Sequence, residues 1–310
     1  MRKYLGRIIA LCVVVFNCGI MSAQAPFLRQ IDTLDKGFIF YQFAGFEPVT
    51  GADELIYVSE FDMNDPRYKV VFQYKEDRRT TSQAFKEANA LATINATYEK
   101  ESVYIKMDGT VHWAIDSPFV PGSRVPQWKT DAAIALDSDG DVHIEWTGKG
   151  ITIPETRKKY IAMDYPYIFT GSPMLIEDYE PVGKTFAEKG LSDAEVEKLD
   201  YEDPLRHQHV RHPRTAVAMT GDNHLLLIAV DGRRPGLAEG MNAAELTTFI
   251  EHYFHPRYCI NMDGGGSTAM CVRGMGDPVK HVVNFPSKNA TLIRDYERAV
   301  PTHISVVLDE

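Results

Sequence analysis

The 310-residue sequence lacks internal repeats, low-complexity tracts and an excess of basic residues. It has 33 Lys and Arg against 43 Asp and Glu residues, a formal net charge of −10. Proteins that bind a nucleic-acid backbone need a surplus of positive charge. We therefore expect no nucleic-acid partner. The length suits one large domain or two small ones.

Long apolar runs are also missing, except at the N-terminus. Three basic residues within the first seven positions precede the apolar run 8–16, and small residues follow at positions 22, 23 and 25. This pattern predicts a secretory signal peptide over residues 1–23, cleaved after Ala23, because cleavage after Ala25 would leave Pro26 first. No later run approaches the length of a membrane span. We expect an exported protein, periplasmic or extracellular, with no transmembrane segment in the mature chain.

Cysteine is scarce, with four residues in all. Only Cys259 and Cys271 follow the predicted cleavage site, and two cysteines cannot make a disulfide framework. They could pair across the segment between them, but buried free thiols are the favoured interpretation. Lipid attachment at Cys18 is disfavoured because Asn17 stands where a small residue is normally found.

Nucleotide-binding motifs are absent from the most glycine-rich segment, NMDGGGSTAM at residues 261–270. It has neither the Gly-Lys-Ser/Thr ending of a Walker loop nor the dinucleotide fingerprint. Three consecutive glycines are entropically costly, so the run predicts a place where backbone must approach something closely. We expect the N–H groups of residues 264–267 to form an anion-binding nest beside Asp263. Ser267 also loosely fits a nucleophile elbow, which leaves a serine hydrolase using His281 or His303 as a rival.

Strand-like runs outnumber helical ones without regular alternation, which predicts an α+β fold of mixed, mostly antiparallel sheets with a few helices and a central surface cleft. Helices are expected over residues 81–91, from a capping box at Asn242, and in the charged stretch 188–203. We expect an N-terminal β-rich segment, residues 24–91, packed on a main domain, residues 92–310. The expected strands cover residues 38–43, 55–61, 69–74, 103–107, 111–113, 132–137, 142–146, 216–220, 225–230, 259–262 and 303–308.

Two of these strands end alike, one on Asp231-Gly232-Arg233 and the other on Asp263-Gly264-Gly265. Strand ends of this kind can converge on one crevice, where two carboxylates would suit glycoside chemistry. An ordinary Asp-Gly turn is the alternative for Asp231. Arg214 beside Pro213 could grip a phosphate with two nitrogens. Glu297 and Arg298 again place acid and base before a strand, where a surface ion pair is the alternative.

Metal-binding signals are weak. His207, His209 and His212 have no standard helical spacing and are interpreted as part of a charged loop. The segment 137–141 resembles the start of a calcium loop, but the twelfth place is Gly148, so a turn is favoured. No metal ligand is assigned, and a divalent cation that assists phosphate binding stays an open alternative.

Six segments together resemble the phosphodiester glycosidase family: AxINA (92–96), TGSPMLI (170–176), HPRTAVA (212–218), VDGRRPGLAEGM (230–241), NMDGGGSTAM (261–270) and ERAVPTHI (297–304). The resemblance implies hydrolysis of a sugar-1-phosphodiester, which releases a sugar such as N-acetylglucosamine and leaves a phosphomonoester. It implies no redox or nucleotide cofactor. The chain departs from the family's Asn-Gly-Gly-Phe-Phe at Asn95-Ala96-Thr97-Tyr98, so a non-catalytic binder of anionic envelope glycans is a second rival.

The residue types and the resemblance together predict a site. Cleavage of the sugar C1–O bond builds positive charge on the sugar and negative charge on the phosphate, so carboxylates and donors are both needed. The expected catalytic carboxylates are Asp263, Asp231 and Glu297. The expected phosphate- or substrate-binding residues are Asn95, Ser172, Arg214, Thr215, Arg233, Gly264, Gly265, Gly266, Ser267, Thr268 and Arg298.

Overall fold

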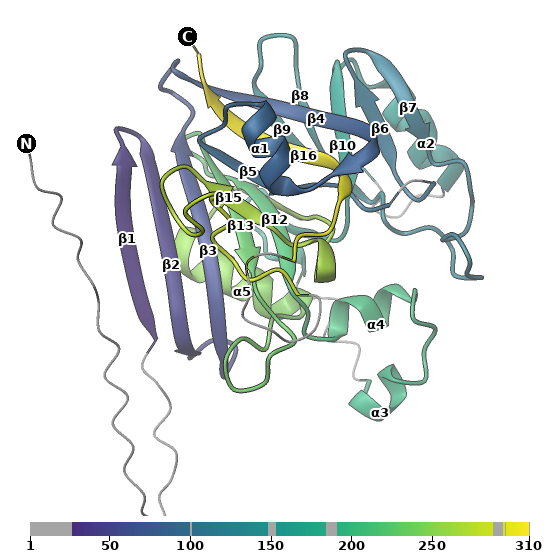
Figure 1. The fold of residues 1–310 in the computed structure, drawn as a ribbon. Helices are drawn as coiled ribbons and strands as arrows, with labels where there is room; N and C mark the ends of the chain where they lie inside the picture. Colours follow the sequence, from purple (N-terminus) through teal and green to yellow (C-terminus); the bar gives the residue numbers. More distant parts are fainter. Residues whose placement is uncertain are drawn as a thin grey trace, which may run out of the picture.

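Three antiparallel sheets make up most of the fold (Figure 1). The computed structural model describes residues 27–99, 101–147, 153–183, 191–287, 294 and 296–309. The predicted signal peptide, with Cys18, lies outside the described residues. The α+β class predicted from the sequence is confirmed.

The largest sheet has seven strands and carries the middle of the chain. On β13 (His224–Val230), Leu225 and Leu227 face the main core, whereas Leu226 and Ile228 pack beneath helix α5 (Ala243–Phe254). Both faces of this strand are therefore covered, which explains its continuous apolar run. In spatial order the sheet contains β1 (Leu28–Asp35), β2 (Phe38–Glu47), β3 (Ala52–Asp62), β13 (His224–Val230), β12 (Arg214–Met219), β14 (Tyr258–Asn261) and β11 (Met174–Glu177).

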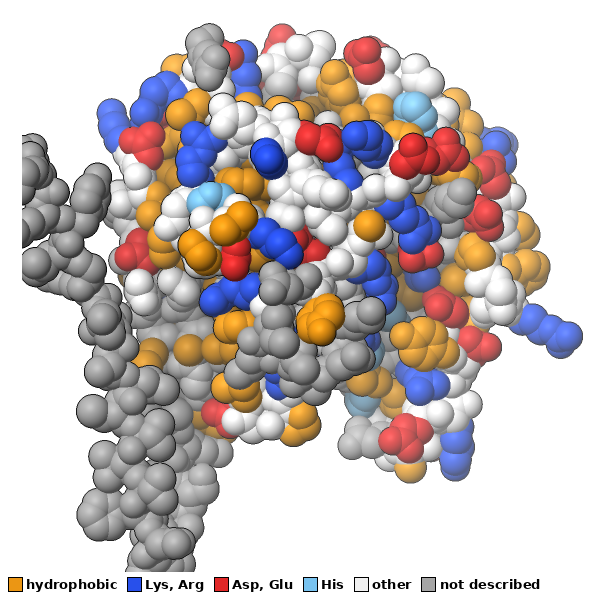
Figure 2. Space-filling view, viewed as in Figure 1, with side chains coloured by type: hydrophobic (Ala, Val, Ile, Leu, Met, Phe, Trp, Pro, Cys, Tyr) orange, Lys and Arg blue, Asp and Glu red, His pale blue; other side chains and the backbone are white. Residues whose placement is uncertain are grey.

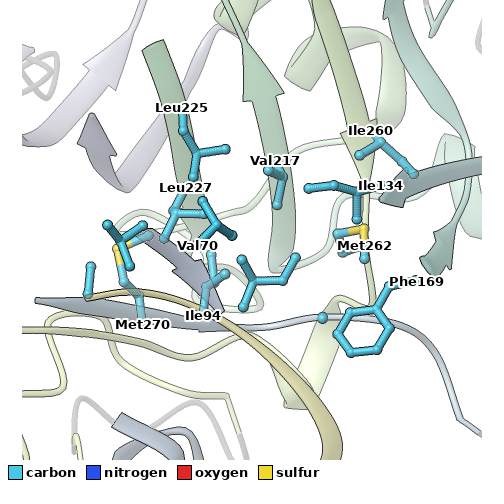
Figure 3. Close-up of a cluster of buried hydrophobic side chains, with 14 of the residues drawn as sticks. Val70, Ile94, Ile134, Phe169, Val217, Leu225, Leu227, Ile260, Met262 and Met270 are labelled. Carbon is cyan, nitrogen blue, oxygen red and sulfur yellow. The ribbon is translucent and has the colours of Figure 1, made fainter. Parts of the chain in front are cut away.

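Two smaller sheets enclose the main core. Figure 3 shows side chains from all three sheets pointing toward one another, including Ile94, Ile134 and Leu227. The four-stranded sheet has the order β15 (Met270–Val272), β5 (Ala92–Asn95), β16 (Val300–Leu308) and β4 (Tyr68–Arg79). The five-stranded sheet has the order β7 (Thr110–Ala114), β6 (Tyr104–Met107), β10 (Tyr167–Gly171), β8 (Ala132–Leu136) and β9 (Val142–Trp146).

Helices cover the outer faces. Helix α5 (Ala243–Phe254) begins at the predicted capping box, in which Asn242 and Glu245 bond each other's backbone N–H. Helix α1 (Thr81–Glu87) lies against the four-stranded sheet (Figure 1). It ends four residues before the predicted end, and Asn89 then takes a left-handed backbone conformation with φ 49°. Helix α2 (Ile153–Ala162), like strands β1, β5, β10, β11 and β15, was not predicted.

The charged stretch 188–203 is not one helix. Only α3 (Asp193–Val196) is helical within its described part, and a separate helix α4 (Pro204–His209) follows. Asp203 accepts a hydrogen bond from the N–H of Leu205, and Pro204 occupies the first helical turn, so the sequence here encodes a helix start. Residues 188–190 lie outside the described part of the chain.

Cys259 and Cys271 are buried free thiols, which confirms the favoured interpretation. Strands from residues 28–79 pair with later ones, β3 with β13 and β4 with β16. The division at residues 91 and 92 stays a prediction. Within the described residues, no helix is long and apolar enough to cross a membrane.

Candidate active site

A pocket of about 300 Å³ lies between the start of β12 and the loop that follows β14. Basic and acidic side chains are interspersed over the face shown in Figure 2, so the pocket's cations belong to no broad basic surface on that face. Most lining side chains are polar or charged, which suits a ligand that forms hydrogen bonds and carries charge. The lining residues are Tyr98, Glu99, Ser102, Val120, Pro121, Lys129, Tyr201, Glu202, His207, His212, Pro213, Arg214, Arg233, Asp263, Gly264, Gly265, Gly266 and Arg298.

The glycine run forms one wall of this pocket. A Cβ on Gly264 would lie 2.6 Å from the Pro213 carbonyl oxygen. On Gly265 it would lie 3.1 Å from Arg233 Nη2, and on Gly266 2.6 Å from Arg298 Nη2. Gly265 also has φ +60°, which disfavours other residues. The predicted close approach is confirmed, and it is made by two guanidinium groups and the neighbouring backbone.

The predicted nest of backbone donors is only partly available. The N–H of Gly265 donates to Pro213 O at 2.7 Å, and that of Ser267 donates to Gly264 O at 3.2 Å. These bonds fold residues 265–267 into a short 3₁₀ turn. The cationic groups beside this wall are the guanidinium groups of Arg233 and Arg298.

Asp263 presents a carboxylate to the pocket from the start of the same loop. Its N–H donates to Ala96 O at 2.9 Å, and its carbonyl accepts from Asn95 Nδ2 at 2.7 Å. Burial raises the pKa of Asp263 to about 6, and a hydrogen bond from Ser267 together with the charge of Lys129 opposes that rise. The backbone is fixed while the side chain can change protonation near neutral pH.

Several predicted binding residues lie behind the loop rather than on the pocket. The Asn95 Oδ1 atom accepts from Thr215 Oγ1 at 2.9 Å and from the Ala269 N–H at 3.1 Å, and Thr268 Oγ1 lies 3.3 Å from the same threonine. All four residues are buried. These bonds connect β5, β12 and the glycine loop, so Asn95, Thr215 and Thr268 position Asp263.

Ser172 likewise supports the pocket through its backbone. Its carbonyl accepts from the Tyr98 hydroxyl at 2.8 Å and from Asn261 Nδ2 at 2.7 Å, and the Ser172–Pro173 peptide is cis. The Tyr98 ring lines the pocket. Where the chain departs from the family motif, it therefore has Tyr98, whose hydroxyl is hydrogen-bonded to Ser172 and to Asn261 of β14.

Asp231 does not share the pocket with Asp263. Both residues follow strand ends, as predicted, and these two strands flank β12. The Asp231 carboxylate, however, accepts from the Phe285 N–H at 2.9 Å and from Asn284 Nδ2 at 3.1 Å. The side chain is 1% exposed, and burial raises its pKa to about 7. This carboxylate holds the segment after β15 in place.

Glu297 also lies outside the pocket lining. Its carboxylate accepts from the backbone N–H of Ser82 at 2.7 Å and from the Ser82 hydroxyl at 2.5 Å. Ser82 lies in the first turn of α1, where a carboxylate satisfies helix N–H groups. Glu297 therefore caps a helix, whereas its neighbour Arg298 reaches the pocket.

Arg214 lines the pocket, but its guanidinium group is hydrogen-bonded to backbone carbonyls of the protein. Its Nε donates to Met241 O at 2.8 Å, and its Nη2 donates to His207 O at 2.8 Å and Val210 O at 2.9 Å. The side chain is 1% exposed, and burial lowers its pKa to about 10. These bonds leave no Nε and Nη2 pair for two phosphate oxygens, so Arg214 shapes the wall instead.

A model of the phosphodiester glycosidase family matches residues 88–307. The chain belongs to this family. No curated protein matches it. Zebrafish N-acetylglucosamine-1-phosphodiester α-N-acetylglucosaminidase, in the form of a catalytic domain auto-inhibited by its pro-peptide, is similar in structure with a TM-score of 0.55 and 16% identity, over 91% of this chain and 82% of that one. A hypothetical protein from Synechocystis gives a TM-score of 0.57 and 13% identity, over 92% and 64%. These structures show a shared fold.

Several residues of the pocket lining were not predicted as site residues, among them Tyr98, Lys129, His207 and His212. The histidines were assigned to a charged loop, yet burial and nearby Arg214 lower the pKa of both, which leaves them neutral at pH 7. Lys129 follows Trp128 in a segment with no recognised motif. The sequence around Lys129 contains no signal of a binding site, because only tertiary contacts bring this residue to the pocket.

Among the described residues, no group of three or more His, Cys, Asp or Glu side chains is arranged to hold a metal ion. In the segment that resembles a calcium loop, Asp137 Oδ1 accepts from the N–H groups of Asp139 at 3.0 Å and Asp141 at 2.9 Å. This is the geometry of a turn, as favoured from the sequence.

The serine hydrolase rival makes a direct prediction about Ser267. Its hydroxyl donates to Asp263 and lies 3.4 Å from Arg298 Nη1, and its described partners include no imidazole. His303 is buried in β16, and His281 contacts Phe85. We expect a fluorophosphonate probe to leave Ser267 unlabelled, as read by mass spectrometry beside a known serine hydrolase as positive control. Stoichiometric labelling would restore the rival.

Proposed function

We propose that the protein is an exported hydrolase that cleaves the glycosidic bond of a sugar-1-phosphodiester. The products are a free sugar, such as N-acetylglucosamine, and a phosphomonoester. The proposal rests on one observation: the Asp263 carboxylate lies in the same pocket as the guanidinium groups of Arg233 and Arg298, which lie against the glycine run. Family membership supports the reaction class.

The two charge types match the two halves of the reaction. As the C1–O bond breaks, the sugar gains oxocarbenium character while the bonding electrons pass to the phosphate oxygen. Arg233 and Arg298 bind the phosphate and stabilise its growing charge. Asp263 acts on the sugar side as the carboxylate that stabilises or attacks C1. Water supplies the hydroxyl of the released sugar, and its remaining proton goes to the phosphate product or to solvent.

The size of the pocket limits how much of the substrate it encloses. Ligand pockets range over roughly 300–1,000 Å³, and this one, at about 300 Å³, is at the small end. One sugar ring and its phosphate fill such a volume. The group esterified on the far side of the phosphate then extends out of the pocket, where it adds little discrimination.

An isotope experiment tests the bond that breaks. Purified protein is incubated in H₂¹⁸O with the methyl phosphodiester of N-acetylglucosamine 1-phosphate, with and without chelator. We expect ¹⁸O in the released sugar and none in methyl phosphate. Label in the phosphate product would mean P–O cleavage and contradict a glycosidase. Binding without any product from a panel of such diesters would favour the non-catalytic binder.

A further inference from the structure

Lys129 is held in a fixed position on the pocket wall. Its side chain is only 13% exposed. The Nζ atom lies 5.4 Å from the ring centroid of Tyr98 and 5.6 Å from that of Trp128. Aromatic faces at this distance attract a cation while removing part of its water. A partly desolvated ammonium needs an anionic partner.

Glu202 supplies that partner from a distant part of the chain. Its Oε2 lies 2.8 Å from Lys129 Nζ, and its side chain is 26% exposed. The Glu202 backbone is anchored, since its carbonyl accepts from Trp128 Nε1 at 2.8 Å and the His207 ring lies 4.9 Å from the Trp128 ring. In Figure 1 this segment, with α3 and α4, stands beside the body of the protein. The surrounding contacts therefore hold the Lys129 ammonium and the Glu202 carboxylate next to each other.

The ion pair lies in the same pocket as Asp263 and Arg298. The charge of Lys129 lowers the pKa of Asp263, so the ammonium is within electrostatic reach of that carboxylate. An ammonium has three N–H donors, and one carboxylate oxygen engages one of them. The Lys129 ammonium is therefore a further cation for an anionic ligand in the pocket, and one of its three N–H donors is already engaged by Glu202.

We propose that Lys129 is a third cation for the anionic group of the ligand, and that Glu202 competes with this group for the ammonium. The inference rests on the proposed function, which makes that group the phosphate of a sugar-1-phosphodiester. Segment 191–210 then sets the affinity of the pocket, because it supplies the competing carboxylate. Removal of Glu202 strengthens phosphate binding only when Lys129 is present.

A double-mutant cycle tests the competition. Binding of inorganic phosphate and of dimethyl phosphate is measured by calorimetry at one fixed, low ionic strength. We expect Lys129→Met to weaken binding about tenfold and Glu202→Gln to strengthen it about fivefold. The double variant should bind as weakly as Lys129→Met alone, and Lys129→Arg should retain most of the affinity.

Two outcomes would overturn the inference. Unchanged binding by Lys129→Met would remove Lys129 from the site. An equal gain from Glu202→Gln in the Lys129→Met background would show that Glu202 acts through its general charge. Matched controls are Lys69→Met and Asp309→Asn, which make the same charge changes in an exposed ion pair of 2.6 Å that does not line the pocket. Both should leave binding unchanged, and melting curves check folding throughout.

Turnover separates this inference from the proposed function. If the wild-type protein releases no sugar while the phosphate-binding pattern holds, the function fails and the anion site stands. If the wild type releases sugar while Lys129→Met leaves KM unchanged, the function stands and the inference fails.

Discussion

Asp263→Asn should abolish turnover of a sugar-1-phosphodiester while leaving the fold intact. Asp263 is the only one of the three predicted carboxylates that lines the pocket. An amide keeps the shape but can neither stabilise a developing cation as a charge nor attack C1. We expect kcat/KM to fall at least about 10³-fold, which corresponds to about 4 kcal/mol of transition-state stabilisation. Sugar release under kcat/KM conditions measures the effect.

The same substitution should not lower the melting temperature at pH 7.5. Burial raises the pKa of Asp263 from 3.8 to about 6, so the ionised carboxylate costs the folded state free energy above pH 6. Asparagine removes that cost, and its amide oxygen can still accept the hydrogen bond from Ser267 without the charge assistance. A matched control is Asp178→Asn, an exposed partner of Arg257, which should leave activity unchanged. Wild-type activity in Asp263→Asn would remove Asp263 from the mechanism.

The pH dependence of the wild-type rate provides a related test. If the carboxylate form of Asp263 is required, kcat/KM should fall as pH drops through about 6, because the buried group then binds a proton. Lys129→Met removes a charge that opposes this protonation, so the acid limb of its profile should move to higher pH.

The sequence predicted best what local chemistry determines. The glycine run with its close approaches and the capping box at Asn242 both follow from backbone requirements of single residues. Strand β1 was missed because its side chains are mostly exposed, and α2 because its sequence has a weak apolar stripe. Neither pattern distinguishes a regular element from a polar loop.

Roles of buried polar residues could not be predicted in the same way. Asp231 and Asp263 end similar strands, yet Phe285, 54 residues downstream, satisfies only the first carboxylate. Glu297 is used by a helix 215 residues away in sequence. Such assignments depend on which distant donors the fold brings near, and a single sequence contains no signal for that. The place of Lys129 in the pocket likewise depends on tertiary contacts, namely those with Glu202 and with the rings of Tyr98 and Trp128.

Arg214→Met should destabilise the protein strongly. The guanidinium donates to three backbone carbonyls, which join the start of β12 to α4 and to the residue before the Asn242 cap. Methionine fills similar space but leaves three acceptors in a buried place without these donors, and hydrogen bonds from a charged group are worth roughly 1.5–3 kcal/mol each. Relief from burying the cation offsets part of the loss. We expect the free energy of unfolding to fall by about 3 kcal/mol or more, measured by denaturant titration.

Arg233→Met is the matched comparison, because it removes the same side chain from the same pocket. Arg233 is exposed, and its guanidinium lies over Gly265. We expect a change in the free energy of unfolding within about 0.5 kcal/mol together with weakened phosphate binding. The pair separates an arginine that builds the wall from one that binds the ligand. Equal stability of the two variants, with phosphate binding lost only in Arg214→Met, would reverse these roles and restore Arg214 as the phosphate ligand predicted from the sequence.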